Sequence, residues 1–149
     1  MIANMLSYCM KIVIDTSVWI SALIKKESKA REIFRLVLQR KLFAQMSGAL
    51  LKEYESVMKR KKVISLVPVA PQKQLKLLDA FCSVAEFNTI YYTWRPNLKD
   101  EGDNFLVELA VSSGAEVILT YNEKDFQGSQ LIFNFRVMTP ENFLKEYKI

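Results

Sequence analysis

Histidine is absent from this chain of 149 residues, and cysteine occurs only twice, at Cys9 and Cys82. The absence of histidine excludes His-based general acid–base catalysis and every His-ligated metal site. Two cysteines without metal-like spacing argue against a disulfide framework and predict a reducing, cytoplasmic environment. Any catalysis must therefore rest on carboxylates, amides, hydroxyls or lysine.

Glycine and proline are also scarce, at four residues each, and there is no internal repeat or low-complexity linker. The chain is long enough for one domain with a sizeable core. It contains no run of about twenty apolar residues, so we expect no membrane span. Met10 stands directly before the first apolar strand. We therefore expect residues 1–10 to be an N-terminal extension and residues 11–149 to form the single domain.

Basic residues outnumber acidic ones by 21 to 16, which gives a net charge of +5. This mild bias is consistent with a polyanionic partner but is too small to prove one. The basic residues gather at positions 25–31 and 59–62. Taken alone, each group is better interpreted as a solvated helix end than as an RNA-binding patch, because cations suit a helix C-terminus.

Hydrophobic periodicity predicts strands that alternate with helices. Strands are expected at residues 11–15, 42–44, 89–92, 116–120 and 135–138. Helices are expected at 17–23, 28–40, 47–61, 71–85, 104–113 and 140–147, with one turn of helix at 122–126 and a loop or edge segment at 63–70. Ser17 and Ser47 are the expected N-caps of the first and third helices, and Gly114 is expected to end the helix before it.

The predicted strands are too apolar to face water on either side, which indicates a parallel sheet covered by helices on both faces. We therefore predict an α/β fold, a three-layer α/β/α domain with a central parallel sheet. In such sheets ligands bind beyond the carboxyl ends of the strands. Asp15 and Thr120 both stand at predicted strand ends, so the Asp15 carboxylate should face the functional crevice.

Three further acidic residues are candidates for the same crevice as Asp15: Glu53, Asp100 and Asp103. Each has an ordinary explanation as a helix cap or a surface residue, and for Glu53 alone that explanation is the better one. These ordinary explanations do not account for their expected convergence on one sheet edge, because carboxylates brought together repel one another and need a cation. Hard oxygen ligands select Mg²⁺ or Mn²⁺ over zinc or copper.

Four sequence runs resemble the PIN-domain family: "IVIDTSVWISAL", "GALLKEYESVMKR", "LKDEGDNFLVELAVSSGAEVILTYNEKDF" and "RVMTPENFL". They occur in the family's order and spacing over residues 11–144. They look most like the bacterial branch of toxins from toxin–antitoxin modules, the VapC-like ribonucleases. The resemblance implies a metal-dependent ribonuclease with an acidic pocket. It implies Asp15, Glu53 and Asp103 as the three acidic residues, and Asp100 as an additional acid of this branch.

The sequence departs from the family pattern at one place. Where many members carry a fourth aspartate, this chain has Asn122, preceded by Tyr121 instead of glycine. An amide oxygen can still coordinate Mg²⁺ or hold a water but adds no negative charge, which weakens the case for a tightly held second metal. The hypothesis is that Asp15, Asp103 and Asp100 hold the metal, directly or through water, and that Glu53 binds a water or assists as general base. Thr16, Ser17 and Thr120 would orient these carboxylates or contact phosphate.

Two other classes of enzyme or signalling domain also place an aspartate at the end of a parallel strand. Haloacid-dehalogenase-type phosphatases need a second aspartate two residues after the first, where this chain has Ser17. Receiver domains need an acidic pair at the first strand, which is missing. The stronger alternative is a catalytically weakened PIN-like RNA-binding or protein-interaction module. The resemblance also implies an RNA substrate, a small antitoxin partner, a homodimer and no membrane association.

Overall fold

The fold is given by a computed structural model that describes residues 9–90, 104–126 and 133–148. Its centre is a five-stranded sheet with the order β3-β2-β1-β4-β5, and every pair of neighbouring strands is parallel. The strands are β1 (Lys11–Ile14), β2 (Phe43–Met46), β3 (Glu86–Phe87), β4 (Val117–Leu119) and β5 (Arg136–Met138). The parallel sheet predicted from the apolar strands is therefore present.

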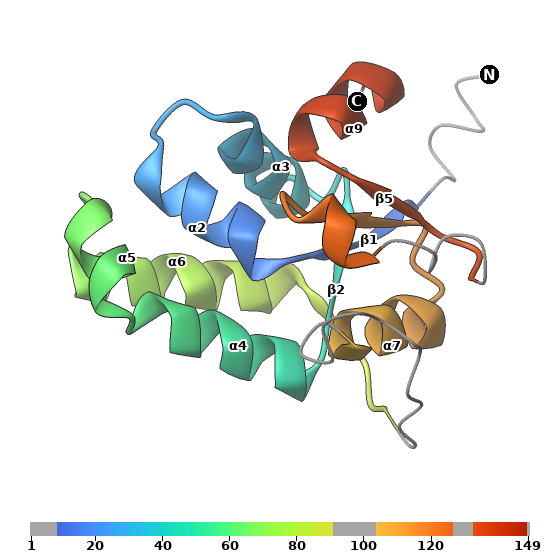
Figure 1. The fold of residues 1–149 in the computed structure, drawn as a ribbon, viewed down its shortest axis with the longest axis horizontal. Coiled ribbons are helices and arrows are strands. Elements are labelled where there is room, and N and C mark those ends of the chain that lie inside the picture. The colour runs from blue at the N-terminus through green and yellow to red at the C-terminus, as the bar shows by residue number, and fades with distance from the viewer. Residues whose placement is uncertain (1–8, 91–103, 127–132, 149) are drawn as a thin grey trace.

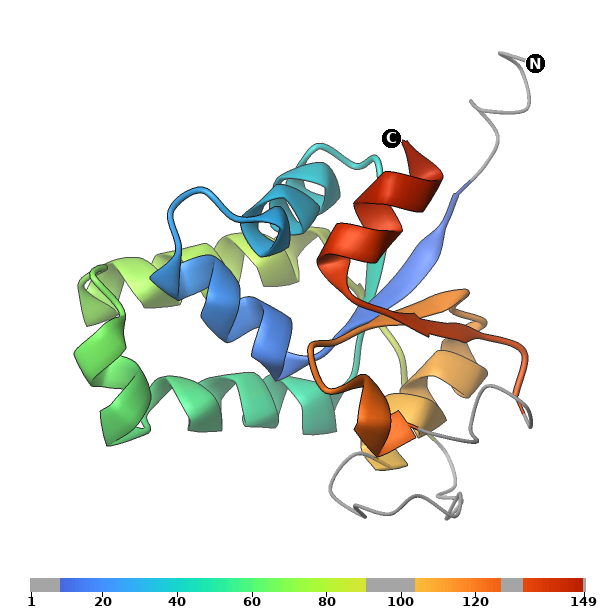
Figure 2. The ribbon, with the colours of Figure 1, turned by 45° about the horizontal axis from the view of Figure 1, so that its top comes forward.

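Helices cover both faces of this sheet, as Figures 1 and 2 show, with α7 on one side and α3 and α9 on the other. The helices are α2 (Thr16–Ile24), α3 (Lys29–Leu38), α4 (Gly48–Met58), α5 (Lys61–Leu66), α6 (Pro71–Val84), α7 (Asn104–Ser113) and α9 (Pro140–Tyr147), with a short 3-10 helix, η2 (Glu123–Phe126). The three-layer α/β/α architecture is confirmed.

Local capping signals account for several helix starts. Ser28, Ser47 and Thr139 each accept a hydrogen bond from the backbone N–H three residues on, at the starts of α3, α4 and α9. Gly114 follows α7 with a φ of +73°, a left-handed conformation that suits glycine. The Ser47 and Gly114 predictions are thus confirmed, because both signals act within one turn of chain.

Three local predictions were wrong. Ser17 does not cap α2, because that helix begins one residue earlier and Asp15 occupies the N-cap position. Residues 61–66 form helix α5 instead of a loop, and Val63 in that helix is buried. The strand expected at residues 89–92 is not present in its described half, because β3 ends at Phe87 and Thr89 and Ile90 have no strand structure; residues 91–92 lie outside the described residues.

The core contains a cluster of aromatic rings between α2, α3, α4 and α6. Trp19 stacks on Tyr54 with 5.5 Å between ring centroids and meets Phe34 edge-on at 5.2 Å. Phe81 closes the cluster 5.9 Å from Tyr54 and 5.0 Å from Phe34. Such pairs stabilise beyond the area they bury, so this cluster fixes α2 and α4 against each other near the end of β1.

One residue of the first basic group, Arg31, has a structural role. Arg31 donates from Nε and Nη2 to the Ala22 carbonyl at 2.9 and 2.6 Å, which satisfies the C-terminal end of α2. Met10 is also structural, since its side chain is buried and its carbonyl accepts from the Phe43 N–H at 3.0 Å.

Within the described ranges, no helix is long and apolar enough to cross a membrane.

Candidate active site

Asp15 follows β1 directly, at the carboxyl end of the sheet. Its backbone N–H donates to the Leu119 carbonyl at 2.9 Å, and its own carbonyl accepts from Val18 N–H at 3.0 Å. The residue is 6% exposed, and its side chain makes no capping hydrogen bond to α2. The helix-cap explanation for this carboxylate therefore does not hold.

Two hydroxyl groups hold the Asp15 carboxylate instead. Thr120 Oγ1 donates to Oδ2 at 2.7 Å and Ser17 Oγ donates to the same oxygen at 3.0 Å. Each hydroxyl also accepts a hydrogen bond from a backbone N–H: Thr120 Oγ1 from Asn122 at 2.9 Å and Ser17 Oγ from Tyr121 at 3.1 Å. Because a backbone N–H can only donate, each hydroxyl is left to direct its single proton toward the carboxylate.

This arrangement fits a carboxylate that receives a cation. Oδ1 accepts one hydrogen bond from the described residues, a long one of 3.4 Å from Thr16 Oγ1. No lysine or arginine in the described parts of the chain forms an ion pair with Asp15. A buried carboxylate without a counter-ion is costly, and a hard carboxylate oxygen with few hydrogen bonds suits Mg²⁺ or Mn²⁺.

Glu53 lies on α4 beside the residue that ties this helix to β1. Tyr54 Oη donates to the Ile14 carbonyl at 2.6 Å, one residue before Asp15. The pKa of Tyr54 is well above its ordinary value because the ring is buried and, to a lesser extent, because the Asp15 charge lies nearby. Glu53 itself pairs with Arg60 across 3.3 Å, and both side chains are substantially exposed. Such a pair is weak and easily exchanged for another partner.

The remaining two predicted ligands, Asp100 and Asp103, lie outside the described residues. Within the described part of the chain, no three acidic, histidine or cysteine side chains come close enough to form a metal site. Asn122 follows β4 and is exposed, and its backbone N–H is bound to Thr120 Oγ1. Of the predicted site residues, the structure therefore brings together Asp15, Thr16, Ser17, Thr120 and the backbone of Asn122.

Glu108 is a buried acidic residue that the sequence reasoning missed. It is 7% exposed on α7 and lines a cavity of about 390 Å³ together with Ser47 and Asn88, which follow β2 and β3. It therefore lies at the same carboxyl edge of the sheet as Asp15. The sequence signal for it was a single acid inside the apolar run "FLVELA". Such an acid is expected to be buried with the helix face, and charged residues are rarely fully buried without a specific reason.

The fold and this edge define a three-layer α/β/α domain with a buried acidic group beyond its first parallel strand. The chain belongs to the PIN domain family, whose family model matches residues 11–124. An uncharacterized protein of Methanocaldococcus jannaschii, MJ1680, is 32% identical and covers 93% of this chain and 92% of its own length. This relative is archaeal, so it does not confirm the bacterial branch suggested by the motifs.

Two solved structures share the fold. A chain of VapBC2 from Rickettsia felis, bound to a DNA fragment from its promoter, has a TM-score of 0.55 and 18% identity, with 86% of this chain and 97% of that chain covered. A chain of DNA-bound VapBC from Salmonella typhimurium has a TM-score of 0.55 and 22% identity, with coverages of 88% and 98%. At these identities the similarity establishes the fold alone.

Proposed function

We propose that this protein is a metal-dependent endoribonuclease that hydrolyses RNA phosphodiester bonds and acts as the toxin of a toxin–antitoxin module. The observation that carries the proposal is the Asp15 carboxylate, which is buried, oriented by two hydroxyls and without a described cationic partner. Membership of the PIN domain family supports nuclease chemistry at this position. The toxin role is supported by the fold that the chain shares with VapBC structures.

Asp15 would hold the cation through Oδ1, with Asp103 and Asp100 as the further carboxylates. A bound Mg²⁺ or Mn²⁺ supplies charge neutralisation and a more acidic water. Ser17 and Thr120 keep Oδ2 occupied, so that the carboxylate presents its other oxygen outward. Glu53, whose partner Arg60 is exposed, is available to accept a proton from the attacking water.

The direct test is RNA cleavage by the purified full chain in Mg²⁺ or Mn²⁺ and in EDTA. We expect cleavage that requires the metal and is lost in Asp15→Asn. Glu55→Gln is the control, since it removes an exposed acid of α4 that is not among the proposed site residues, and it should cleave like the natural protein. Metal-independent cleavage, or full activity in Asp15→Asn, would contradict the proposed chemistry.

A second function is favoured by one specific feature, the neutral Asn122 where many family members carry an acid. With one carboxylate fewer, the site would bind metal more weakly, and the domain would act as an RNA-binding or protein-interaction module. This alternative predicts RNA retention without cleavage at any Mg²⁺ or Mn²⁺ concentration. Gel-shift and cleavage measurements on the same RNA distinguish the two functions.

An apolar groove supports the proposed antitoxin partner. It has a volume of about 310 Å³ between α2, α3 and α6, and its walls include Phe34, Leu38 and Leu77. Leu38 and Leu77 are 45% and 39% exposed, which is unfavourable for large apolar side chains facing water. Arg35 and Lys73 line the same groove. A partner segment with apolar side chains flanked by carboxylates would complement it.

Co-purification with the protein encoded by the neighbouring reading frame tests this partner. Leu38→Glu and Leu77→Glu should weaken the complex, and Leu75→Glu is the control because Leu75 is an exposed leucine of α6 outside the groove lining. We also propose, from the family resemblance, that the chain forms a homodimer, and light scattering of the isolated protein measures this directly.

A further inference from the structure

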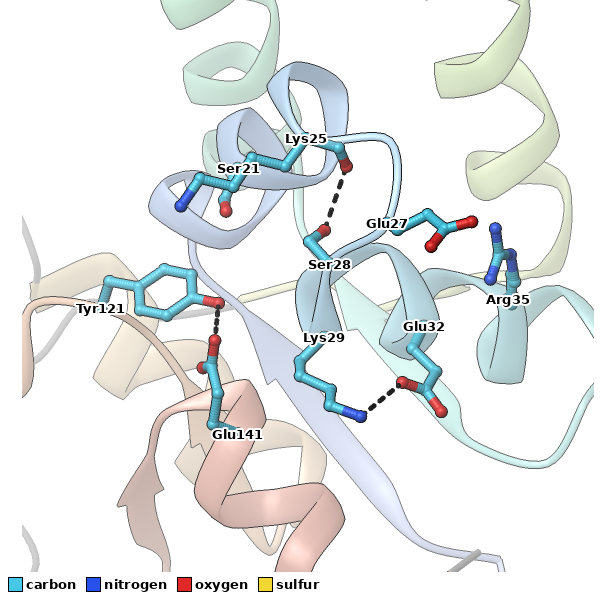
Figure 3. A pocket seen from close by; sticks show the side chains of 9 residues that line it. All are labelled: Ser21, Lys25, Glu27, Ser28, Lys29, Glu32, Arg35, Tyr121 and Glu141. Atoms are coloured by element: carbon cyan, nitrogen blue, oxygen red, sulfur yellow. Dashed lines mark hydrogen bonds and ion pairs between the residues drawn. The ribbon is translucent and has the colours of Figure 1, made fainter.

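A wide cavity of about 800 Å³ opens beside the Asp15 network, between α2, α3, α9 and the segment that follows β4. Figure 3 shows Tyr121 and Glu141 on one side of it and the side chains of α3 on the other. Tyr121 is connected to the candidate active site, because its backbone N–H donates to Ser17 Oγ, which in turn donates to Asp15 Oδ2. The cavity therefore begins two hydrogen bonds from the proposed metal ligand.

Tyr121 and Glu141 form a fixed pair in this cavity. Tyr121 Oη lies 3.1 Å from Glu141 Oε2, as Figure 3 shows. Burial, and then the hydrogen bond to Glu141, raise the pKa of Tyr121 to about 12. At neutral pH the phenol is therefore the donor and the carboxylate the acceptor. The tyrosine is still 36% exposed, so part of the ring is accessible to a ligand.

Glu141 retains acceptor capacity after binding Tyr121. A carboxylate offers about four lone-pair sites, and the phenol uses one of them. Among the described residues, no lysine or arginine forms an ion pair with Glu141, whereas Glu32 in the same cavity is paired with Lys29 at 3.4 Å. An aromatic ring beside an unpaired carboxylate can stack on a planar ligand and accept its N–H groups.

The charge of the cavity indicates which part of an RNA would occupy it. Its lining carries as many basic as acidic side chains, namely Lys25, Lys29, Arg35, Glu27, Glu32 and Glu141. A surface that follows phosphates should be predominantly basic, which this one is not. Balanced donors and acceptors suit a base, which carries both kinds of group without net charge.

We propose that Tyr121 and Glu141 form a specificity subsite for one unpaired guanine adjacent to the scissile phosphate. Guanine is the base that presents two neighbouring N–H donors, N1–H and N2–H, to a carboxylate. Adenine, cytosine and uracil each place an acceptor beside the donor on that edge, and a carboxylate repels an acceptor. This subsite rests on the proposed ribonuclease function and assigns to that function a base preference.

Binding of mononucleotides to the full chain tests the subsite independently of cleavage. GMP, AMP, CMP and UMP are titrated in the absence of divalent metal, and the backbone amide signals of Tyr121 and Glu141 are followed by NMR. We expect GMP to shift them at concentrations at least about tenfold lower than the other three nucleotides. IMP, which lacks the N2 amino group, should bind less tightly than GMP, and 7-deaza-GMP should bind equally well.

Three variants locate the preference. Tyr121→Ala removes the stacking ring and should weaken the binding of all nucleotides. Glu141→Gln replaces one acceptor oxygen by a donor and should abolish the discrimination between GMP and IMP. Glu146→Gln is the matched control, since it removes an acid from the same helix outside the cavity. Equal binding of all four nucleotides, undiminished GMP affinity in Tyr121→Ala, or a GMP preference over IMP that survives Glu141→Gln overturns the subsite.

Cleavage of single-stranded RNAs that contain one guanine in an adenine–uracil background separates the two proposals. Cleavage next to guanine that is lost selectively in Glu141→Gln supports both. Cleavage that does not depend on guanine overturns the subsite and supports the proposed ribonuclease function. Selective GMP binding by a chain that cleaves no RNA supports the subsite and contradicts the ribonuclease.

Discussion

Thr120 and Asp15 are 105 positions apart in the chain, and the Thr120 hydroxyl donates to the Asp15 carboxylate at 2.7 Å. The contact exists because Ile14 and Leu119 are register partners in the parallel pair β1–β4. The residues that follow these partners leave the sheet side by side at its carboxyl edge. The orientation of the central carboxylate is thus set by strand register.

Thr120→Val should disturb this orientation while preserving the shape of the side chain. It removes a charge-assisted donor to Asp15 and the acceptor of the Asn122 N–H. We expect a loss of about 1.5–3 kcal/mol in unfolding free energy and roughly a 10–100-fold loss in metal affinity. Denaturant unfolding and calorimetric metal titration measure the two effects. Thr120→Ser keeps the hydroxyl and should retain most of the metal affinity.

Asp15→Asn should abolish RNA cleavage and leave the fold intact. The amide retains one acceptor oxygen for the Ser17 and Thr120 hydroxyls, and it removes a buried charge that has no described cation. We expect the unfolding free energy to stay within about 1 kcal/mol of the natural protein, or to rise slightly. Thermal unfolding without metal is the measurement. A large destabilisation would mean that the carboxylate is structural.

Trp19→Ala should act on stability. The indole is 3% exposed and packs against Tyr54, Phe34 and Phe81 at centroid distances of 5.5, 5.2 and 6.2 Å. Removing it leaves a large cavity, so we expect a loss of roughly 3–5 kcal/mol. Trp19→Phe should lose less, because the Trp19 indole N–H is buried without a partner among the described residues. Urea unfolding of both variants checks the order.

Asn122→Asp should change the metal dependence of cleavage. Asn122 follows Thr120 closely enough for its N–H to bind the Thr120 hydroxyl at 2.9 Å, so an added charge lies near the Asp15 network. The variant should saturate with Mg²⁺ or Mn²⁺ at a lower concentration than the natural protein, because one more hard anionic oxygen is present. Identical metal curves would mean that this side chain does not face the site or that one metal suffices.

The raised pKa of Tyr121 predicts that the stability of the fold decreases at alkaline pH. Its pKa is about 12 in the folded protein, against an ordinary value of 10.0, so the folded state holds this proton more tightly. The associated stabilisation is complete below pH 10 and is lost as the pH rises towards 12. Tyr121→Phe should remove part of this decline and leave the pH dependence between 6 and 9 unchanged. Thermal unfolding of both proteins from neutral pH up to pH 12 measures the difference, which should appear only above pH 10.

Local sequence signals predicted much of the fold. Strand β1, the serine cap of α4 and the helix α9 were found where expected, because apolar periodicity and capping depend on residues a few positions apart. Helix α5 was missed because residues 61–66 are β-branched and apolar in part, and Val63 becomes helical by packing against its neighbours. Strand β3 was not predicted because its two residues are both exposed, which leaves no hydrophobic pattern to detect.

The sequence by itself determined that carboxylates, not histidines, must carry any chemistry, and that Asp15 lies at the end of an apolar strand. Those conclusions need only composition and local order. The tertiary structure decided which groups meet Asp15, since Ser17 comes from α2 and Thr120 from the far end of a neighbouring strand. It also brought Tyr121 to Glu141, twenty positions away. These contacts depend on strand register and helix docking, and the periodicity of a single segment determines neither of them.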